Sequence, residues 1–486
     1  MARLLIKSTS YLKEVTSRGQ TPIHLASNWP PGLKILLAAG GNELVNNSDR
    51  HRNLPIGYAC ELECIDSVRM LLESGSALSA RSAWTEHEQI LVYATRRGNG
   101  NKALRAILID ALCRQRGGLY ELALVTLPQD ELDALALPPD RLPDHQAPKL
   151  QATLWNNRVK IPRSLVVTQF AGSVFHVIFD VETAKLLFDL GFRDVNCPDT
   201  SGLTPIMRQC FRSDLKLKEG LQYFDWLLSH GCDLHRTVER DGEFFYLPNV
   251  EAERFIGIFI GQKFMEQSMF EVGCYCLEPR LKHLIHSVFT SASTDSCVCA
   301  CTSNGCSPII TMLRSIEAYP YHIVGESWVE RVKEVRLWSL GWLEKTIEAS
   351  DNHYERLLNS ADIIRFQTFE ELGVRHTCCP VKLWGIKNGG LDDDEIRDIQ
   401  SEDRFLINRL EELVLEFTQQ YKQLEQPLTE FLKGPWASRM EEILKDQSLS
   451  DEELANIRDL GVVLRPDEEG IGTILGSNRY LCVLCK

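Results

Sequence analysis

Apolar residues recur in the first half of the chain as short helical blocks that end at glycine. Pro22 opens one such block and Pro55 opens another, 33 positions later, and a second apolar block follows each of them. The same order returns once more between residues 184 and 231. Proline suits the first position of a helix, and glycine suits a helix end in the left-handed conformation. The pattern therefore predicts pairs of short helices that repeat about every 33 residues.

The block starts share a motif. Thr-Pro-Ile-His at 21–24 is matched by Leu-Pro-Ile-Gly at 54–57 and Thr-Pro-Ile-Met at 204–207, and the second blocks end in Leu-Leu-x-x-Gly at 36–40 and 227–231. These residues resemble the ankyrin repeat. The resemblance implies an all-α fold, a degenerate ankyrin-like solenoid of helix pairs with hairpin loops, followed by an α-helical C-terminal region. Stacking of neighbouring pairs buries the apolar faces that one pair cannot bury alone.

Two histidines take a structural role from this resemblance. His24 lies in the first motif, and His176 ends a divergent copy, Ser-Val-Phe-His, at 173–176. The resemblance implies that both tie neighbouring repeats together by hydrogen bonds. The paired segments 297–308 and 369–379 also look like those of large, uncharacterised ankyrin-type proteins of filamentous fungi, which implies no known activity.

The repeat pattern divides the chain into four predicted segments. We expect N-terminal ankyrin-like repeats at 1–120, a proline-rich connector at 121–160, a second ankyrin-like block with an insertion and a cysteine cluster at 161–320, and a helical, acidic region at 321–486. The repeat is expected to resurface at Gly-Cys-Ser-Pro, residues 305–308. In the last segment, apolar spacing predicts helices near 328–343, 361–372 and 405–424, and a capping box at 450–453 predicts one more. We expect Trp338 and Trp342, on the first of these, to be core residues.

Charge limits the partners. The formal net charge is −14, and residues 391–470 alone hold 22 acidic and 9 basic side chains, so the repeats are close to neutral. The net charge argues against general binding to nucleic acid or to an anionic membrane surface. This exclusion is stronger for residues 391–470 and weaker for residues 1–390, where a local basic patch stays possible. The longest apolar run, at 255–261, is too short to span a membrane, and no signal peptide is apparent. We therefore expect an intracellular protein, in cytoplasm or nucleus, whose cysteines are thiols or metal ligands.

The cysteines are unevenly placed, because six of the 16 fall within 33 positions. Cys297, Cys299 and Cys301 alternate, so on an extended segment their sulfurs point to one side, and Cys306 follows a glycine-containing turn. Four such thiolates form a tetrahedral zinc site, and His376 is a further, remote candidate ligand. Two interpretations stay open here: a structural zinc ion, or small buried thiols that fill a repeat interface.

Catalysis has little support in the sequence. A Cys–His nucleophile would have to be assembled from His376 and Cys378 or Cys379, and no residue that would orient the histidine is identifiable. A phosphate-binding loop, a His-Glu-x-x-His helix and a Gly-x-Ser-x-Gly turn do not occur in the sequence. We therefore predict a protein without enzymatic activity.

The leading hypothesis is a protein-interaction scaffold or adaptor whose repeat tips contact other proteins. The predicted contact residues at these tips are Asp49, Arg50, His51, Arg81, Trp84, Asp199 and Thr200. The alternative is a zinc-stabilised regulatory module built on ankyrin repeats, and a third class is an enzyme within the C-terminal region. The sequence leaves the identity of the partner and the oligomeric state open.

Overall fold

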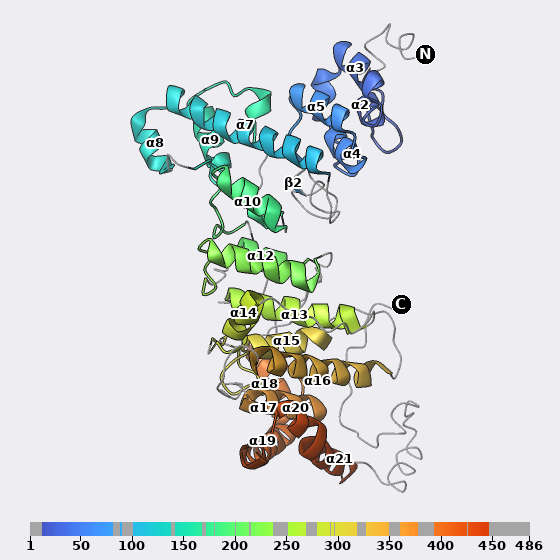
Figure 1. Cartoon of the computed structure of the whole chain (residues 1–486), viewed down its shortest axis with the longest axis vertical. Helices are drawn as coiled ribbons and strands as arrows, with labels where there is room; N and C mark the ends of the chain where they lie inside the picture. Colours follow the sequence, from blue (N-terminus) through green and yellow to red (C-terminus); the bar gives the residue numbers. More distant parts are fainter. Residues whose placement is uncertain are drawn as a thin grey trace. The chain divides into compact units, whose positions relative to one another are not determined.

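The structure is a computed structural model that describes residues 12–80, 88–89, 101–137, 141–167, 172–178, 180–199, 201–212, 215–236, 251–268, 279–291, 293–295, 297–317, 327–348, 360–377, 393–424 and 426–446. It forms two compact units. Unit 1 holds residues 1–215 and 219–233, and unit 2 holds residues 216–218 and 234–486. The predicted all-α class is confirmed (Figure 1), since the strands among the described residues are β1 (Ser79–Ala80) and β2 (Glu88–Gln89), an antiparallel pair two residues long.

Unit 1 begins with two helix pairs and continues through longer helices. Its elements are α2 (Pro22–Leu25), α3 (Pro30–Ala38), η2 (Gly41–Leu44), α4 (Pro55–Glu61), α5 (Ile65–Glu73), α7 (Lys102–Thr126), α8 (Gln129–Leu135), α9 (Ala147–Asn156), η3 (Arg163–Leu165), η4 (Val174–His176), α10 (Val181–Asp189), α11 (Pro205–Gln209) and most of α12 (Leu217–Ser229). The pair α2–α3 begins at Pro22 and the pair α4–α5 begins at Pro55, the two prolines that the sequence pattern predicted as helix starts. This confirms the ankyrin-like class of fold.

One backbone turn precedes the first helix of these repeats. Gly19, Arg52 and Gly202 adopt the left-handed conformation, with φ of 77°, 64° and 77°, three positions before the proline that opens α2, α4 and α11. Glycine reaches this conformation without a steric penalty, and the second copy tolerates an arginine there. We call residues 49–53 and 199–203 the repeat turns.

Asp49 and Asp199 close the two repeat turns from inside. In each turn the Oδ1 atom of the aspartate accepts two backbone N–H groups, from the residues two and four positions later. The distances are 2.9 and 2.8 Å for His51 and Asn53, and 2.8 and 3.1 Å for Ser201 and Leu203. These carboxylates therefore organise the chain locally, because they satisfy donors that would otherwise face the turn interior.

His24 and His176 connect each repeat to the next turn, which confirms their predicted structural role. In both, Nδ1 accepts the backbone N–H of the N-cap residue, at 3.0 and 2.9 Å. The opposite nitrogen, Nε2, donates to the carbonyl of Asn53 at 3.1 Å and of Leu203 at 2.9 Å. Only a neutral imidazole with its proton on Nε2 makes both bonds.

Two asparagines make a second tie between successive repeats. Asn46 Nδ2 donates to the carbonyl of Gly75 at 2.9 Å, and Oδ1 accepts the backbone N–H two residues beyond that glycine at 2.7 Å. Asn196 makes the same pair of bonds around Gly231, at 2.6 and 2.8 Å. Each amide thus pairs one donor and one acceptor of the following helix end, where backbone groups lack partners within the helix.

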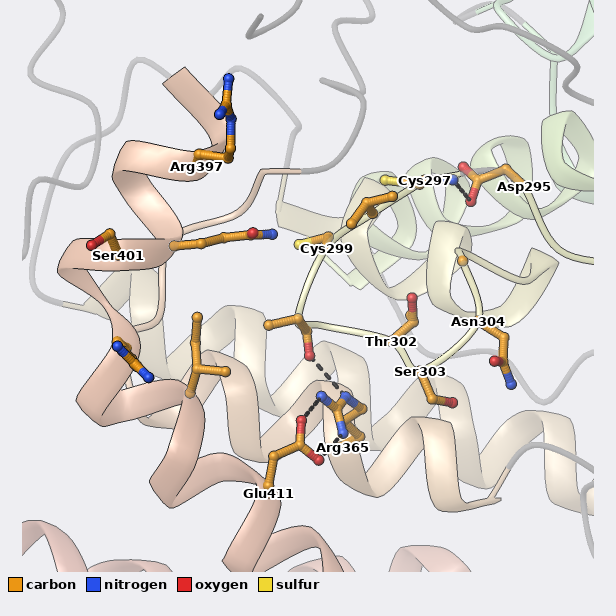
Figure 2. Close-up of a pocket in the computed structure, with 16 residues that line it drawn as sticks. Asp295, Cys297, Cys299, Thr302, Ser303, Asn304, Arg365, Arg397, Ser401 and Glu411 are labelled. Atoms are coloured by element: carbon orange, nitrogen blue, oxygen red, sulfur yellow. Dashed lines mark hydrogen bonds and ion pairs between the residues drawn. The ribbon is translucent and has the colours of Figure 1, made fainter. Parts of the chain in front are cut away.

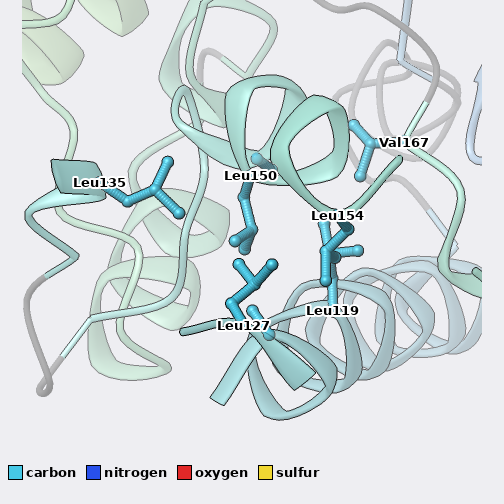
Figure 3. Packing of buried hydrophobic residues seen from close by; sticks show 8 residues of the cluster. Leu119, Leu127, Leu135, Leu150, Leu154 and Val167 are labelled. Atoms are coloured by element: carbon cyan, nitrogen blue, oxygen red, sulfur yellow. The ribbon is translucent and has the colours of Figure 1, made fainter. Parts of the chain in front are cut away.

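The proline-rich segment 121–160 is helical over much of its length, and its predicted role as a connector stays a prediction. α9 packs on the second half of α7, and α8 packs on α9, around a buried cluster (Figure 3). Its members are Leu119, Ala123, Leu127, Leu135, Ala147, Leu150, Leu154 and Val167. The prolines do not interrupt these helices, because Pro128 is the N-cap of α8 and Pro148 lies in the first turn of α9.

Unit 2 contains the remaining helices. They are α13 (Ala252–Ser268), α14 (Pro279–Phe289), α15 (Pro308–Glu317), α16 (Ser327–Glu348), α17 (Ser360–Glu371), α18 (Asp393–Glu402), α19 (Arg404–Leu424), α20 (Leu428–Phe431), the π-helical turn η5 (Leu432–Trp436) and α21 (Ala437–Asp446). The predicted helices are confirmed as α16, α17 and α19, and the one expected at 450–453 lies outside the described residues. Among the helices that the structure describes, none is both long and apolar enough to cross a membrane.

The closest helix packing in unit 2 involves α13 and α15. A Cβ atom at Gly257 would lie 2.4 Å from the carbonyl oxygen of Pro308, and one at Gly261 would lie 2.3 Å from that of Met312. The two glycines are one helical turn apart, so together they let the α15 backbone approach α13. On the same helix, Phe264 meets the rings of Trp338 and Trp342 edge-on, each at 5.0 Å between centroids.

Acid is expected to destabilise unit 1 through the two repeat histidines. Burial lowers the pKa of His24 and His176 below the ordinary value of 6.5. Their contribution to stability is therefore complete above about pH 6.5 and is lost as the pH falls toward the folded-state pKa, since the unfolded chain then binds more protons.

Hydrogen exchange of peptides from η4 and α11, measured at about pH 5.5 and pH 7.5 and corrected for the intrinsic rate, checks this expectation. Protection in the wild type should fall at the lower pH. In a His24→Gln, His176→Gln variant the difference between the two pH values should shrink. Equal pH dependence in both proteins would contradict the assignment of these neutral imidazoles.

Candidate metal centre

Residues 295–306, which we call the Cys loop, form an enlarged repeat turn. Asp295 Oδ1 accepts the N–H groups of Cys297 at 3.1 Å and Cys306 at 2.6 Å. Gly305 has φ of 94°, three positions before Pro308, which confirms the predicted return of the repeat motif. In the ordinary repeat turns the aspartate and the last donor are 4 positions apart, whereas here they are 11 apart. The extra residues thus carry the alternating cysteines.

The extra part of the Cys loop is held by α17 and by the segment after it. Arg365, on α17, donates through Nε to the carbonyl of Ala300 at 2.8 Å. Thr377 donates from Oγ1 to the carbonyl of Val298 at 3.1 Å. These bonds join segments more than sixty positions apart in the chain. They bring the loop beside the end of α17, where His376 lies.

Three predicted ligands meet at this point. The ligand atoms of Cys299, Cys301 and His376 all lie within 4.8 Å of one another. Cys299 Sγ is 3.9 Å from His376 Nδ1 and accepts the backbone N–H of Thr377 at 3.4 Å. Cys301 is fully buried and Cys299 is 6% exposed. The arrangement offers two sulfur ligands and one nitrogen ligand, the donor types that zinc prefers.

The other two predicted thiols belong to a different group. Cys297 and Cys306 lie with Asp295, again with ligand atoms within 4.8 Å of one another. Asp295 is already engaged, because its Oδ1 closes the turn and its Oδ2 forms a buried ion pair with Arg254 at 2.6 Å. The four cysteines predicted as one tetrahedral set are therefore divided between two neighbouring groups, and only one of these includes the predicted remote ligand, His376.

A chain of charged contacts supports His376 from behind. Its Nε2 is hydrogen-bonded to Glu370, which also accepts from Arg336 Nη1 at 3.0 Å. Burial acts to raise the pKa of Glu370, but Arg336 and then His376 hold it well below its ordinary range. Burial and Arg314 act to lower the pKa of His376, whereas Cys299 and Glu370 raise it above its ordinary value. The imidazole is thus fixed, with Nδ1 directed at sulfur.

An open pocket of about 760 Å³ lies between the Cys loop and helices α18 and α19 (Figure 2). Figure 2 shows Arg365 at its base, bound to Glu411 by a two-pronged ion pair. Cys299 and Thr302 line the loop side, and Arg397 lines the opposite side. The pocket gives solvent a route to the edge of the thiol group.

The predicted tip residues fall into three groups: some are exposed, some are engaged within a repeat turn, and some lie outside the described residues. Arg50 and His51 are exposed at the first repeat turn. Asp49 is only 5% exposed, because its carboxylate closes the turn and accepts the Tyr58 hydroxyl at 2.6 Å. Asp199 closes its own turn in the same way. Arg81, Trp84 and Thr200, like Cys378 and Cys379, lie outside the described residues. Contact of the tips with a partner stays a prediction.

Sequence reasoning overlooked the residues that support the site. Asp295 had a detectable signal, since Asp49 and Asp199 are each the first residue of a repeat turn, but the longer spacing from Asp295 to the proline hid the likeness. Glu370 and Arg336 carried no signal, because a charged residue on an amphipathic helix looks the same whether it faces solvent or a histidine.

Comparison with known proteins gives little further information. No protein-family model matches the chain, and no curated protein matches it. Among solved structures, the chain is similar to the ankyrin repeat domain of Bcl-3, a member of the IkappaB protein family, with 15% sequence identity and a TM-score of 0.31 over 62% of this chain and 97% of that one. The ankyrin-like class rests on the helix pairs and repeat turns themselves, and the resemblance to fungal proteins stays a hypothesis.

Proposed function

We propose that the chain is a protein-interaction scaffold or adaptor that acts without catalysis. The observation that carries this proposal is a cluster of exposed basic residues on two neighbouring turns of unit 1. Arg18, Arg50, His51 and Arg52 are all exposed, and the N–H of Arg50 donates to the carbonyl of Arg18 at 2.9 Å. We call these four residues the basic turns.

The acidic residue next to Arg50 in the chain, Asp49, directs its charge away from the exposed side of the basic turns. Asp49 directs its carboxylate inward to two backbone N–H groups and to Tyr58, and it is nearly buried. The guanidinium groups around it are thus presented to solvent on a backbone that internal hydrogen bonds hold in place. Arginine recognises carboxylates through paired, planar hydrogen bonds, and a preorganised surface loses less entropy on binding. A partner with an acidic segment fits this surface.

Two buried thiols of unit 1, Cys60 and Cys210, are unsuited to act as nucleophiles. Burial raises the pKa of Cys60 to about 12, and it raises that of Cys210 well above its ordinary value. Protonated, buried thiols are poor nucleophiles, because the thiolate is the reactive form. These cysteines act as small apolar core residues.

Proximity labelling in cells, with the full chain as bait, tests the proposal. The wild type should enrich specific proteins that contain acidic segments. An Arg18→Glu, Arg50→Glu variant should lose most of that enrichment, by about tenfold or more if each arginine contributes a charge-assisted contact.

The matched control reverses the same charge elsewhere on unit 1. Lys34 and Arg69 are exposed on the second helices α3 and α5, so a Lys34→Glu, Arg69→Glu variant should retain the enrichment. A wild type that enriches nothing above background, or two variants that behave alike, would count against the scaffold.

The second candidate function is a zinc-stabilised regulatory module. One observation favours it: Cys299 and Cys301 meet His376, which is 77 positions from Cys299. A metal at that point would fasten the Cys loop to α17 and so determine whether this part of unit 2 is ordered. Such a module would respond to zinc supply or to thiol oxidation.

A further inference from the structure

We propose that Cys299, Cys301 and His376 bind one zinc ion, which fastens the enlarged repeat turn of the Cys loop to the segment that follows α17. The proposal deepens the second candidate function and does not depend on the basic turns of unit 1. It also selects one of the two thiol groups as the metal site and gives the other a role in folding.

The ordinary repeat turns decide between the two groups. In those turns an aspartate Oδ1 accepts the N–H groups at both ends, and Asp295 does the same with Cys297 and Cys306. These two cysteines therefore stand where His51 and Asn53 stand in the first repeat, and no metal is needed to place them. Cys299 and Cys301 lie in the inserted residues, which have no counterpart in a repeat turn and which Arg365 and Thr377 hold beside His376.

The geometry of the selected group suits a shared ion. Tetrahedral bonds of about 2.3 Å to sulfur and 2.0 Å to nitrogen place the two ligand atoms about 3.5 Å apart. Cys299 Sγ and His376 Nδ1 are 3.9 Å apart, too long for a strong direct hydrogen bond and close to the separation across a metal. A shift of a few tenths of an ångström would bring these two atoms to the separation expected across a zinc ion.

The surroundings of the ligands match those of metal-bound residues. His376 presents Nδ1 to the sulfurs, and its Nε2 is held by the carboxylate of Glu370, which Arg336 fixes in turn. A carboxylate behind a ligating histidine sets its tautomer and strengthens it as a ligand. The N–H of Thr377 donates to Cys299 Sγ, and such a bond favours the thiolate form that binds metal.

Charge balance supports zinc at a buried position. Cys301 is fully buried, so two thiolates at this position carry a high cost in desolvation, which Arg365 near Cys301 offsets only in part. Zinc(II) neutralises both, and the fourth tetrahedral position is left to a further ligand of the chain or to water.

The same residues invite one competing interpretation, a cysteine nucleophile. Cys299, His376 and Glu370 have the order of a nucleophile, a base and a residue that orients the base. The second thiol argues against it, because a nucleophile needs no other thiol within 4.8 Å, whereas a metal does. Zinc-bound sulfur is also shielded from alkylation, so chemistry separates the two.

Metal analysis of the purified full chain tests the site. The wild type should contain about one zinc per chain. A Cys299→Ser, Cys301→Ser variant should contain at least about fivefold less zinc per chain than the wild type, since two of the ligands are removed. A Cys297→Ser, Cys306→Ser variant, with two thiols removed from the same loop, should retain it. Replacing zinc by cobalt in the wild type should produce thiolate-to-cobalt charge-transfer absorption, which reports thiolate ligands without any substitution.

Several results would overturn the proposal. Zinc below about 0.3 per chain in the wild type, together with no cobalt–thiolate absorption, would exclude a thiolate metal site. Loss of zinc in the Cys297→Ser, Cys306→Ser variant would place the ligands in the other group. Rapid alkylation of Cys299 in the wild type as purified would favour the nucleophile. The Arg18→Glu, Arg50→Glu variant should keep its zinc whether or not it binds a partner, so failure of the scaffold and failure of the metal site are distinguishable.

Discussion

A Gly257→Ala, Gly261→Ala variant is expected to open the core of unit 2, although alanine is the better helix former. Each added Cβ would lie within 2.4 Å of a carbonyl oxygen of α15, which is backbone and cannot turn aside. Overpacking of this kind costs about 3 kcal/mol, against a gain of about 1 kcal/mol per residue in helix propensity. Hydrogen exchange in peptides from α13 and α15 should rise accordingly in the variant.

Gly341, in the middle of α16, provides the control for this prediction. The nearest atom to a Cβ there would be Thr429 Cγ2, at 3.6 Å, an ordinary contact. A Gly341→Ala variant should therefore be neutral or more stable by up to about 1 kcal/mol. If the double variant in α13 were equally well tolerated, the close packing of α13 on α15 would be wrong.

The second large effect is expected in unit 1, where His176→Ala should destabilise the second repeat block by about 3 kcal/mol. The substitution leaves the buried N–H of Ser173 without a partner, and an unpartnered buried group of this kind costs about 1–3 kcal/mol. It also removes one of the two donors to the carbonyl of Leu203, which keeps the N–H of Asp199. Urea unfolding followed by hydrogen exchange of η4, α11 and α12 measures the loss, which should be local to unit 1.

His51 is the matched control, since it is an exposed histidine in the same unit. A His51→Ala variant should change the free energy of unfolding by less than about 0.5 kcal/mol. A cost below about 1 kcal/mol for His176→Ala would show that its two hydrogen bonds do not hold the repeats together.

The repeat turns could be predicted from the sequence because their interactions are local. A left-handed glycine, an N-cap residue and a proline lie within four positions of one another, so motif and geometry coincide at Gly19 and Gly202. The helices of unit 2 were predictable for the same reason, since an apolar stripe is a property of one segment. Their partners were not. Only the structure shows that α15 approaches α13 closely at Gly257 and Gly261.

The proline-rich segment shows a different limit. Prolines indicate a break in a helix but also suit a helix start, and the sequence does not distinguish the two when helices are short. Pro128 and Pro148 lie at helix starts, and the leucines between them complete the cluster around Leu150. Only part of the candidate metal site could be predicted. The thiols are close together in the sequence, but which of them lie beside His376 depends on where α17 packs.

Site-specific photocrosslinking tests the central claim, that the basic turns bind a protein partner. A photoreactive amino acid at position 51 places the probe within the basic turns. The same amino acid at position 34, an exposed position of α3, serves as the reference. In cells, the probe at position 51 should give discrete adducts with proteins that carry acidic segments, and these should disappear when Arg18 and Arg50 are changed to Glu. The same adducts from both positions, or none from position 51, would contradict it.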